Sequence, residues 1–207
     1  MRKIEIWRIE YEYTTSFWKP RKNGNTNAIV QRVAERLKTN HNVEICRITD
    51  YQINGCLGCN HCQSVLDKPG CVQDDDVTRL LGKVMDADVV LYGTPLYGHS
   101  YSGQLKLLMD RHVALFKFVG GSDKAVDEME IKSFIENRSV GLIVSCQGPG
   151  ENNTELVQMQ FRKFCESSLA FCLGTYIFPW CSPDVIGSQF SEDTLNQIVC
   201  DVEAQNK

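Results

Sequence analysis

The chain has 207 residues, a formal net charge of −4 and a pI near 5.6. This length suits one domain with a full hydrophobic core. An acidic chain without a basic stripe argues against nucleic acid as the main partner, and no stretch reaches the roughly 20 apolar residues of a membrane span. Residues 1–5 carry charges and no apolar segment, so we expect no signal peptide. Ten cysteines without such a signal are typical of the cytoplasm, where clustered cysteines more often bind metal than form disulfides.

Strand-like and helix-like segments alternate along the chain. The first segment, 11–17, alternates polar and apolar residues, which predicts a half-exposed strand at a sheet edge or beneath a partner subunit. The next elements are a helix ending near 37, a strand at 43–48, a helix at 75–85, a strand at 88–92, a helix at 104–116, a strand at 140–145, a helix at 155–171, a strand at 175–178 and a helix at 192–203. This alternation predicts a parallel sheet with helices on both faces. Residues 122–137 are charged and weakly patterned, so we expect an excursion there.

The segment 19–26 (Lys-Pro-Arg-Lys-Asn-Gly-Asn-Thr) precedes the first predicted helix. Free backbone N–H groups at a helix N-terminus bind phosphate, and Gly24 permits a close approach. Arg21, Asn25 and Thr26 add hydrogen-bond donors. An ordinary Asn-Gly turn followed by an Asn or Thr helix cap would give the same pattern.

Two further loops, 94–103 and 146–153, each follow a predicted strand. In doubly wound sheets, ligands bind at the carboxyl ends of the strands. Backbone amides of the first loop can bond the edge of a ligand's ring and Tyr97 can stack on it, while His99 is expected to orient a ligand or lie on the rim. The predicted ligand contacts are Thr94, Pro95, Leu96, Tyr97, Gly98, His99, Cys146, Gln147 and Gly148. A locally packed surface loop and a glycine-rich turn are the respective alternatives.

Four cysteines fall within sixteen residues: Cys56-Leu-Gly-Cys59-Asn-His-Cys62, then Cys71 after eight further residues. Thiolates at this spacing can turn inward from one loop, and they suit an iron–sulfur cluster or zinc. His61 also leaves a zinc site open. The loop follows the strand at 43–48, so we expect it on the same rim of the sheet as the loops 94–103 and 146–153. Four unligated thiols, or a pair that forms a disulfide, are the remaining alternatives.

Segment 19–26 resembles the Ser-Pro-Arg-x-x-Gly-Asn-Thr phosphate loop of the NADPH-dependent FMN reductase family. Segment 56–77 is similar to the cysteine loop of iron–sulfur flavoproteins, and segments 87–97 and 104–111 match the same family's next strand, flavin loop and helix. These motifs occur in order over roughly residues 18–182. Trp18-Lys19 replaces the expected Gly-Ser, so Lys19 substitutes by charge for a missing hydroxyl, and Asn23 completes the predicted loop ligands. The gap between Cys62 and Cys71 is slightly longer than is usual in cluster-bearing relatives.

The resemblance implies a flavodoxin-like fold: a doubly wound five-stranded parallel sheet of order 2-1-3-4-5, with a cysteine-rich loop (55–73) after the second strand. It implies a single FMN-binding domain over 1–207, and a homodimer or homotetramer. We therefore predict an iron–sulfur flavoprotein, an FMN-dependent oxidoreductase of the cytoplasm without a catalytic side chain. Electrons would pass between FMN and a 4Fe–4S cluster on Cys56, Cys59, Cys62 and Cys71, with NAD(P)H or a redox protein as donor.

Two alternatives remain. One is an NAD(P)H-dependent FMN or quinone reductase with a structural or vacant cysteine loop. The other is a non-catalytic binding protein stapled by zinc.

Overall fold

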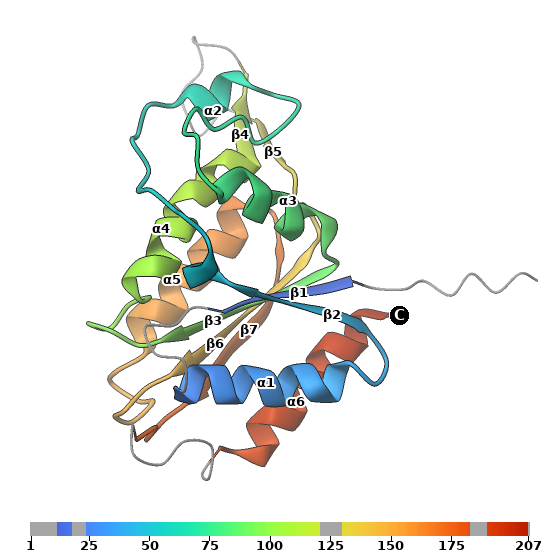
Figure 1. Ribbon diagram of the computed structural model, residues 1–207, viewed down its shortest axis with the longest axis vertical. Helices are drawn as coiled ribbons and strands as arrows, with labels where there is room; N and C mark the ends of the chain where they lie inside the picture. Colours follow the sequence, from blue (N-terminus) through green and yellow to red (C-terminus); the bar gives the residue numbers. More distant parts are fainter. Residues whose placement is uncertain (1–11, 18–23, 121–129, 183–189, 207) are drawn as a thin grey trace, which may run out of the picture.

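The computed structural model describes residues 12–17, 24–120, 130–182 and 190–206 as a sheet with helices on both faces (Figure 1). The sheet contains β1 (Glu12–Phe17), β2 (Asn42–Arg47), β3 (Val89–Pro95), β6 (Ser139–Ser145) and β7 (Phe171–Phe178). The helices are α1 (Asn25–Leu37), α2 (His61–Ser64), α3 (Val77–Asp86), α4 (Gly103–Arg111), α5 (Glu155–Ser167) and α6 (Glu192–Glu203). Short turns of 3₁₀ helix are η1 (Ile48–Asp50), η2 (His112–Leu115) and η4 (Ala204–Asn206), and a separate antiparallel pair is β4 (Phe116–Val119) and β5 (Glu130–Ser133). Within these ranges, no helix is long and apolar enough to cross a bilayer.

All pairings in the larger sheet are parallel, and the strands lie in the order β2-β1-β3-β6-β7. Side chains of a strand alternate between the two faces. Val90 and Tyr92 of β3 therefore pack with α3, α4 and α5, whereas Val89 and Leu91 pack with α1 and α6. Figure 1 shows these two helix layers on opposite faces. The predicted α/β class with a parallel sheet is confirmed.

The first strand does not lie at an edge, so that prediction is wrong. β1 pairs with β2 on one side and with β3 on the other. Backbone hydrogen bonds to β2 and β3 fix the central position of β1, and these bonds do not depend on the polarity of its side chains. The polar alternation of Glu12–Phe17 is not explained by a central position.

Two predicted helices are longer than the helices in the structure. α4 ends at Arg111, and Phe116 already belongs to β4, which pairs with β5 in the predicted excursion. α5 ends at Ser167, since Leu169 adopts a left-handed conformation (φ 53°) and turns the chain into β7.

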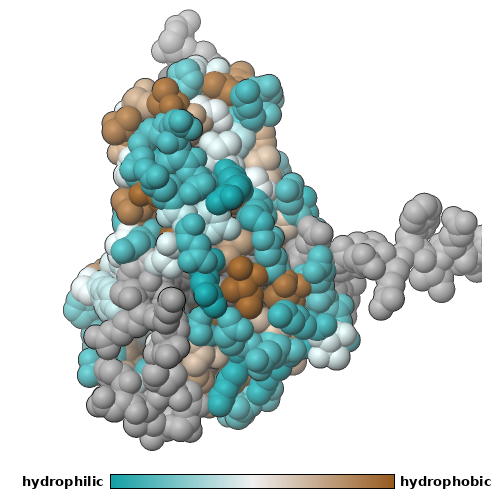
Figure 2. Space-filling model, in the orientation of Figure 1, coloured by the Kyte–Doolittle hydropathy of each residue, from teal (hydrophilic) through white to brown (hydrophobic). Residues whose placement is uncertain are grey.

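The hydrophobic residues inside leave the surface mainly polar: on the face drawn in Figure 2, apolar residues form small separate groups.

His112 fixes the end of α4 in the core, where its ring is 0% exposed. Its Nδ1 donates to the Leu108 carbonyl at 2.7 Å, which leaves Nε2 to accept from the Tyr92 hydroxyl at 2.8 Å. The neutral ring is thus fully hydrogen-bonded. Burial lowers the pKa of His112 from the ordinary 6.5 to about 4.

This shift predicts acid sensitivity. Below pH 6.5 the unfolded chain binds a proton that the folded chain excludes, so the free energy of unfolding falls as the pH drops towards 4, by about 3 kcal/mol at most. Urea unfolding between pH 7 and 4.5 should show a shallower dependence in His112→Gln than in the parent chain. Equal slopes would mean that His112 does not titrate in this way.

Candidate flavin and cysteine sites

The loops that follow β3 and β6 meet at the carboxyl ends of these neighbouring strands. The Leu96 N–H donates to the Ser145 carbonyl at 2.8 Å, and His99 Nδ1 donates to the Asn153 carbonyl at 3.1 Å. Between the loops lies a cavity of about 200 Å³, lined by Leu96, Gly98, His99, Cys146, Gln147, Gly148 and Asn153. Six of these residues were predicted from the sequence, and Asn153 was not. Burial raises the pKa of the Cys146 thiol, so this side chain enters the cavity wall as a neutral group.

The three other predicted residues of the first loop do not line this cavity. Thr94 is 0% exposed, and its hydroxyl lies 2.9 Å from Ser102 Oγ, so that it ties the two ends of the loop together. Tyr97 begins a tight turn that Gly98 and His99 form in the left-handed region, with φ of 55° and 61°. The Tyr97 side chain is 52% exposed at this turn.

The predicted phosphate site is described only on its helical side, because Lys19, Arg21 and Asn23 lie outside the described residues. Gly24 is the extended N-cap of α1 and offers no side-chain cap, and the first turn contains no acid. Thr26 is buried, and its hydroxyl lies 2.5 Å from Ser145 Oγ at the end of β6. Asn25 Nδ2 donates to the Ser182 carbonyl at 2.7 Å, and the buried Asn25 Oδ1 has no hydrogen-bond partner among the described residues.

All four cysteines of the predicted metal site line one small hollow, together with Arg111, Val113 and Ala114. Cys56 and Cys59 are exposed, Cys71 is half-buried and Cys62 is buried. Among the described residues, no three His, Cys, Asp or Glu side chains converge closely enough to hold a single metal ion. The hollow between the four cysteines is small, with a volume of about 30 Å³.

The hollow does not lie on the rim of the flavin loops, which corrects that expectation. The chain leaves β2 through η1, then runs along α4 towards its C-terminal end. Figure 1 shows α2 beside β4 and β5, away from the carboxyl ends of the sheet. α4 begins at the flavin loop and ends at Arg111. Its nine residues span roughly 13 Å, so the helix separates the two candidate sites by about that length.

Left-handed residues bend the cysteine loop. Gly58, Asn60 and Gly70 have φ of 63°, 57° and 65°. The Gly58 N–H donates to Cys56 Sγ at 3.5 Å. Next to Cys71 the chain passes so close to Val65 that a Cβ on Gly70 would lie 2.4 Å from the Val65 Cβ. A Cβ on Gly58 would meet nothing within 4 Å.

This difference gives a matched pair of variants. Gly70→Ala combines left-handed strain with steric overlap and is expected to lower the free energy of unfolding by about 2–4 kcal/mol. Gly58→Ala carries the strain alone, about 1–2 kcal/mol. Denaturant unfolding measures both. Equal losses would show that the contact with Val65 is unimportant.

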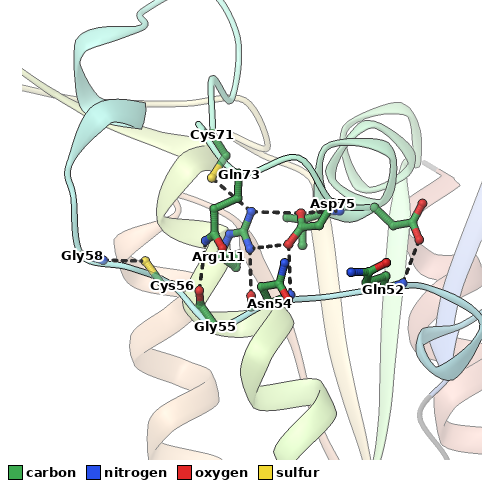
Figure 3. A network of polar contacts seen from close by, with 11 residues as sticks. Gln52, Asn54, Gly55, Cys56, Gly58, Cys71, Gln73, Asp75 and Arg111 are labelled. Carbon is green, nitrogen blue, oxygen red and sulfur yellow. Dashed lines mark hydrogen bonds and ion pairs between the residues drawn. The ribbon is translucent and has the colours of Figure 1, made fainter.

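A buried ion pair joins the end of α4 to the cysteine loop (Figure 3). The side chains of Arg111 and Asp75 are 1% and 0% exposed. Arg111 Nη1 donates to Asp75 Oδ2 and to the Asn54 carbonyl, both at 2.8 Å, while Nη2 donates to Asp75 Oδ1 and to Cys71 Sγ, both at 3.1 Å. Burial by itself would raise the pKa of Asp75, but hydrogen bonds from Arg111 and from the Asn54 and Val77 N–H groups outweigh it and lower the pKa.

Lys117 of β4 holds the other side of the same loop. Its ammonium group is buried and donates to the carbonyls of Cys62, Pro69 and Ala114 at 2.7, 3.1 and 2.9 Å. Asp75 and Arg111 belong to segments that carry the family resemblance, but the sequence did not predict that they pair, and it did not point to Lys117. Arg111 is 36 positions from Asp75, and Lys117 is 55 and 48 positions from Cys62 and Pro69.

Solved structures resemble this fold over nearly its whole length. The NAD(P)H:quinone oxidoreductase from Methanothermobacter marburgensis superposes with a TM-score of 0.61 at 13% identity, covering 96% of this chain and 98% of that one. The two-electron reduced flavodoxin of Megasphaera elsdenii gives 0.53 at 16% identity, covering 92% and 98%. The protein is therefore a flavodoxin-like α/β protein.

Residues 19–181 match the family described as NADPH-dependent FMN reductase, and the chain belongs to this family. An iron–sulfur flavoprotein of Archaeoglobus fulgidus is 38% identical over 88 residues, which are 42% of either chain. An iron–sulfur flavoprotein of Methanocaldococcus jannaschii is 36% identical over 93 residues, 44% of this chain and 47% of the relative. The aligned part of the chain thus spans less than half the length of these relatives.

Proposed function

We propose that the protein is an iron–sulfur flavoprotein: an FMN-dependent oxidoreductase that passes electrons between FMN in the loop cavity and a 4Fe–4S cluster on Cys56, Cys59, Cys62 and Cys71. The observation that carries this proposal is the arrangement around α4. The flavin loops lie at its N-terminal end, and the four cysteines surround a hollow at its C-terminal end. NAD(P)H or a redox protein is the proposed donor, and residues 1–207 are proposed to form one FMN-binding domain.

The described part of the loop site fits FMN. An uncapped helix start without acids suits a phosphate group. The orphaned Asn25 Oδ1 is an acceptor, so it suits a hydroxyl such as those of the ribityl chain and not a phosphate oxygen. The proposed protein ligands of the phosphate are Lys19, Arg21, Asn23, Thr26 and, through its backbone N–H at the start of α1, Asn25. Bound FMN would supply the redox chemistry, while these residues bind and orient it.

The polar groups around the cysteine hollow suit an anionic cluster bound by thiolates. Three of the four sulfurs have hydrogen-bond donors beside them: the Gly58 N–H at Cys56, Gln63 at Cys62 and Arg111 at Cys71. Such donors stabilise the negative charge of cluster thiolates. Bound there, the cluster would carry single electrons.

A reductase with a vacant cysteine loop is the second candidate, since the family match does not depend on the cysteines. We also propose a homo-oligomer. Leu156 and Met159 on α5 are each 59% exposed beside a hollow between α4 and α5, and such a face is suited to a second copy of the chain.

The Thr26 hydroxyl tests the phosphate site. If Ser145 donates to Thr26, the Thr26 proton is free for a phosphate oxygen, a charge-assisted bond worth about 1.5–3 kcal/mol. Thr26→Ala should therefore raise the Kd for FMN about tenfold or more, while Thr26→Ser should retain most of the affinity. Fluorescence quenching of FMN on binding to the apoprotein measures both. An unchanged Kd in Thr26→Ala would place the phosphate elsewhere.

A further inference from the structure

We propose that Arg111 is a positioning residue for the cluster. Arg111 donates a hydrogen bond to the Cys71 sulfur and thereby raises the reduction potential of the cluster. This inference rests on the proposed function, because it assumes that the four cysteines hold a cluster. It assigns a role to a side chain outside the four-cysteine motif, on a different element of the fold.

The guanidinium group of Arg111 is fixed before any cofactor binds. Its two terminal nitrogens are held by the Asn54 carbonyl and by both oxygens of Asp75. Asp75 in turn accepts from the Asn54 N–H at 3.0 Å and the Val77 N–H at 3.1 Å. Because every partner is itself held, Nη2 keeps its direction towards Cys71 Sγ (Figure 3).

The third nitrogen of the same group is unsatisfied. Arg111 Nε is buried without a hydrogen-bond partner among the described residues, and the side chain forms part of the wall of the cysteine hollow. A buried N–H without a partner costs free energy unless an acceptor is supplied. A cluster in the hollow, with its sulfurs, would bring acceptors and negative charge to this wall.

Hydrogen bonds to the sulfurs and the local charge set the potential of such clusters. Reduction adds an electron to the cluster, so a donor at Cys71 and a nearby cation both favour the reduced state. Burial keeps water from screening them. Asp75 offsets part of the Arg111 charge, which leaves the directed hydrogen bond as the larger contribution. Electrons would then be drawn from the flavin site towards the end of α4.

Arg111→Lys separates the effect of the positive charge from that of the hydrogen bond to Cys71. Lysine keeps the charge, but its single ammonium group cannot bond Asp75, Asn54 and Cys71 at once as the two terminal nitrogens of arginine do. The experiment reconstitutes the full-length protein anaerobically with iron and sulfide, and then measures the midpoint potential by EPR-monitored potentiometry. The variant should bind cluster and FMN, with a lower midpoint. At the parental midpoint its oxidised-to-reduced ratio should rise about tenfold, which is 59 mV for one electron.

Arg138→Lys is the matched control. Arg138 donates to Asp88 at 2.7 Å in a half-exposed pair, and it lies outside the lining of both candidate sites. Its midpoint should equal the parental one. An unchanged midpoint in Arg111→Lys, or an equal shift in Arg138→Lys, would overturn the inference.

A measurement on the parental protein covers the case in which Arg111→Lys fails to fold. With ¹⁵N-labelled arginine, pulsed EPR of the reduced cluster should detect a ¹⁵N coupling, because Arg111 is the arginine that lines the hollow. A cluster without this coupling overturns the inference and leaves the proposed function intact. A parental protein that takes up no iron overturns the proposed function instead.

Discussion

Replacing Arg111 with Met is expected to lower the free energy of unfolding of the cofactor-free protein by about 3–5 kcal/mol. The substitution keeps a long apolar stem but leaves the Asp75 carboxylate, which is 0% exposed, without its cation. Breaking a buried ion pair by removing one partner costs about that much. Urea unfolding of the apoprotein at pH 7 measures the loss.

Two further variants show whether the lone carboxylate is the cause. The double variant Asp75→Leu with Arg111→Met removes both charges and should recover most of the loss, because apolar replacement of a buried pair is often neutral. Arg138→Met breaks a half-exposed pair and should cost about 1 kcal/mol or less. If the double variant is as unstable as Arg111→Met, lost packing and not the uncompensated charge is responsible.

Replacing Cys59 with Ala is expected to abolish the cluster while FMN binding is retained. Cys59 is exposed, so its thiol contributes little to the core, and the flavin cavity lies at the other end of α4. Iron content should fall to near background. Reduction of a one-electron acceptor should fall at least about tenfold, and reduction of a two-electron acceptor much less.

Cys200→Ala is the control for this variant, since Cys200 is an exposed cysteine on α6 that lies outside the cysteine loop. It should keep the iron, the FMN and both activities. Unchanged iron and activities in Cys59→Ala would contradict the cluster assignment.

Local patterns in the sequence predicted much of the fold. The spacing of Val77, Leu80, Leu81 and Val84 predicted the buried face of α3, and all four are core residues. The apolar runs in β3 and β6 predicted strands covered on both faces, as found. The order of motifs indicated which loops line the candidate flavin cavity. These features depend on neighbours within a few residues, or on the simple geometry of parallel strands.

The features that the sequence did not reveal depend on distant contacts. The alternating residues of β1 favoured an edge, whereas the order 2-1-3-4-5 implied by the resemblance put the first strand between two others, and pairing with β2 and β3 decides its place. The helical pattern of residues 104–116 extends beyond the end of α4. Phe116 belongs to β4 instead, because β4 forms backbone hydrogen bonds with β5 further along the chain. The contacts of Arg111 and Lys117 with the cysteine loop join residues that are 40 and 55 positions apart, so no local pattern predicts them.

Cofactor analysis of the protein distinguishes a four-iron cluster from zinc and from a vacant cysteine loop. The chain is purified and reconstituted anaerobically, and its FMN, iron and acid-labile sulfide are measured beside its visible and EPR spectra. We expect about one FMN, four irons and four sulfides per chain, and an EPR signal from the reduced cluster. Stoichiometric zinc without sulfide, or FMN without iron after reconstitution, would contradict it.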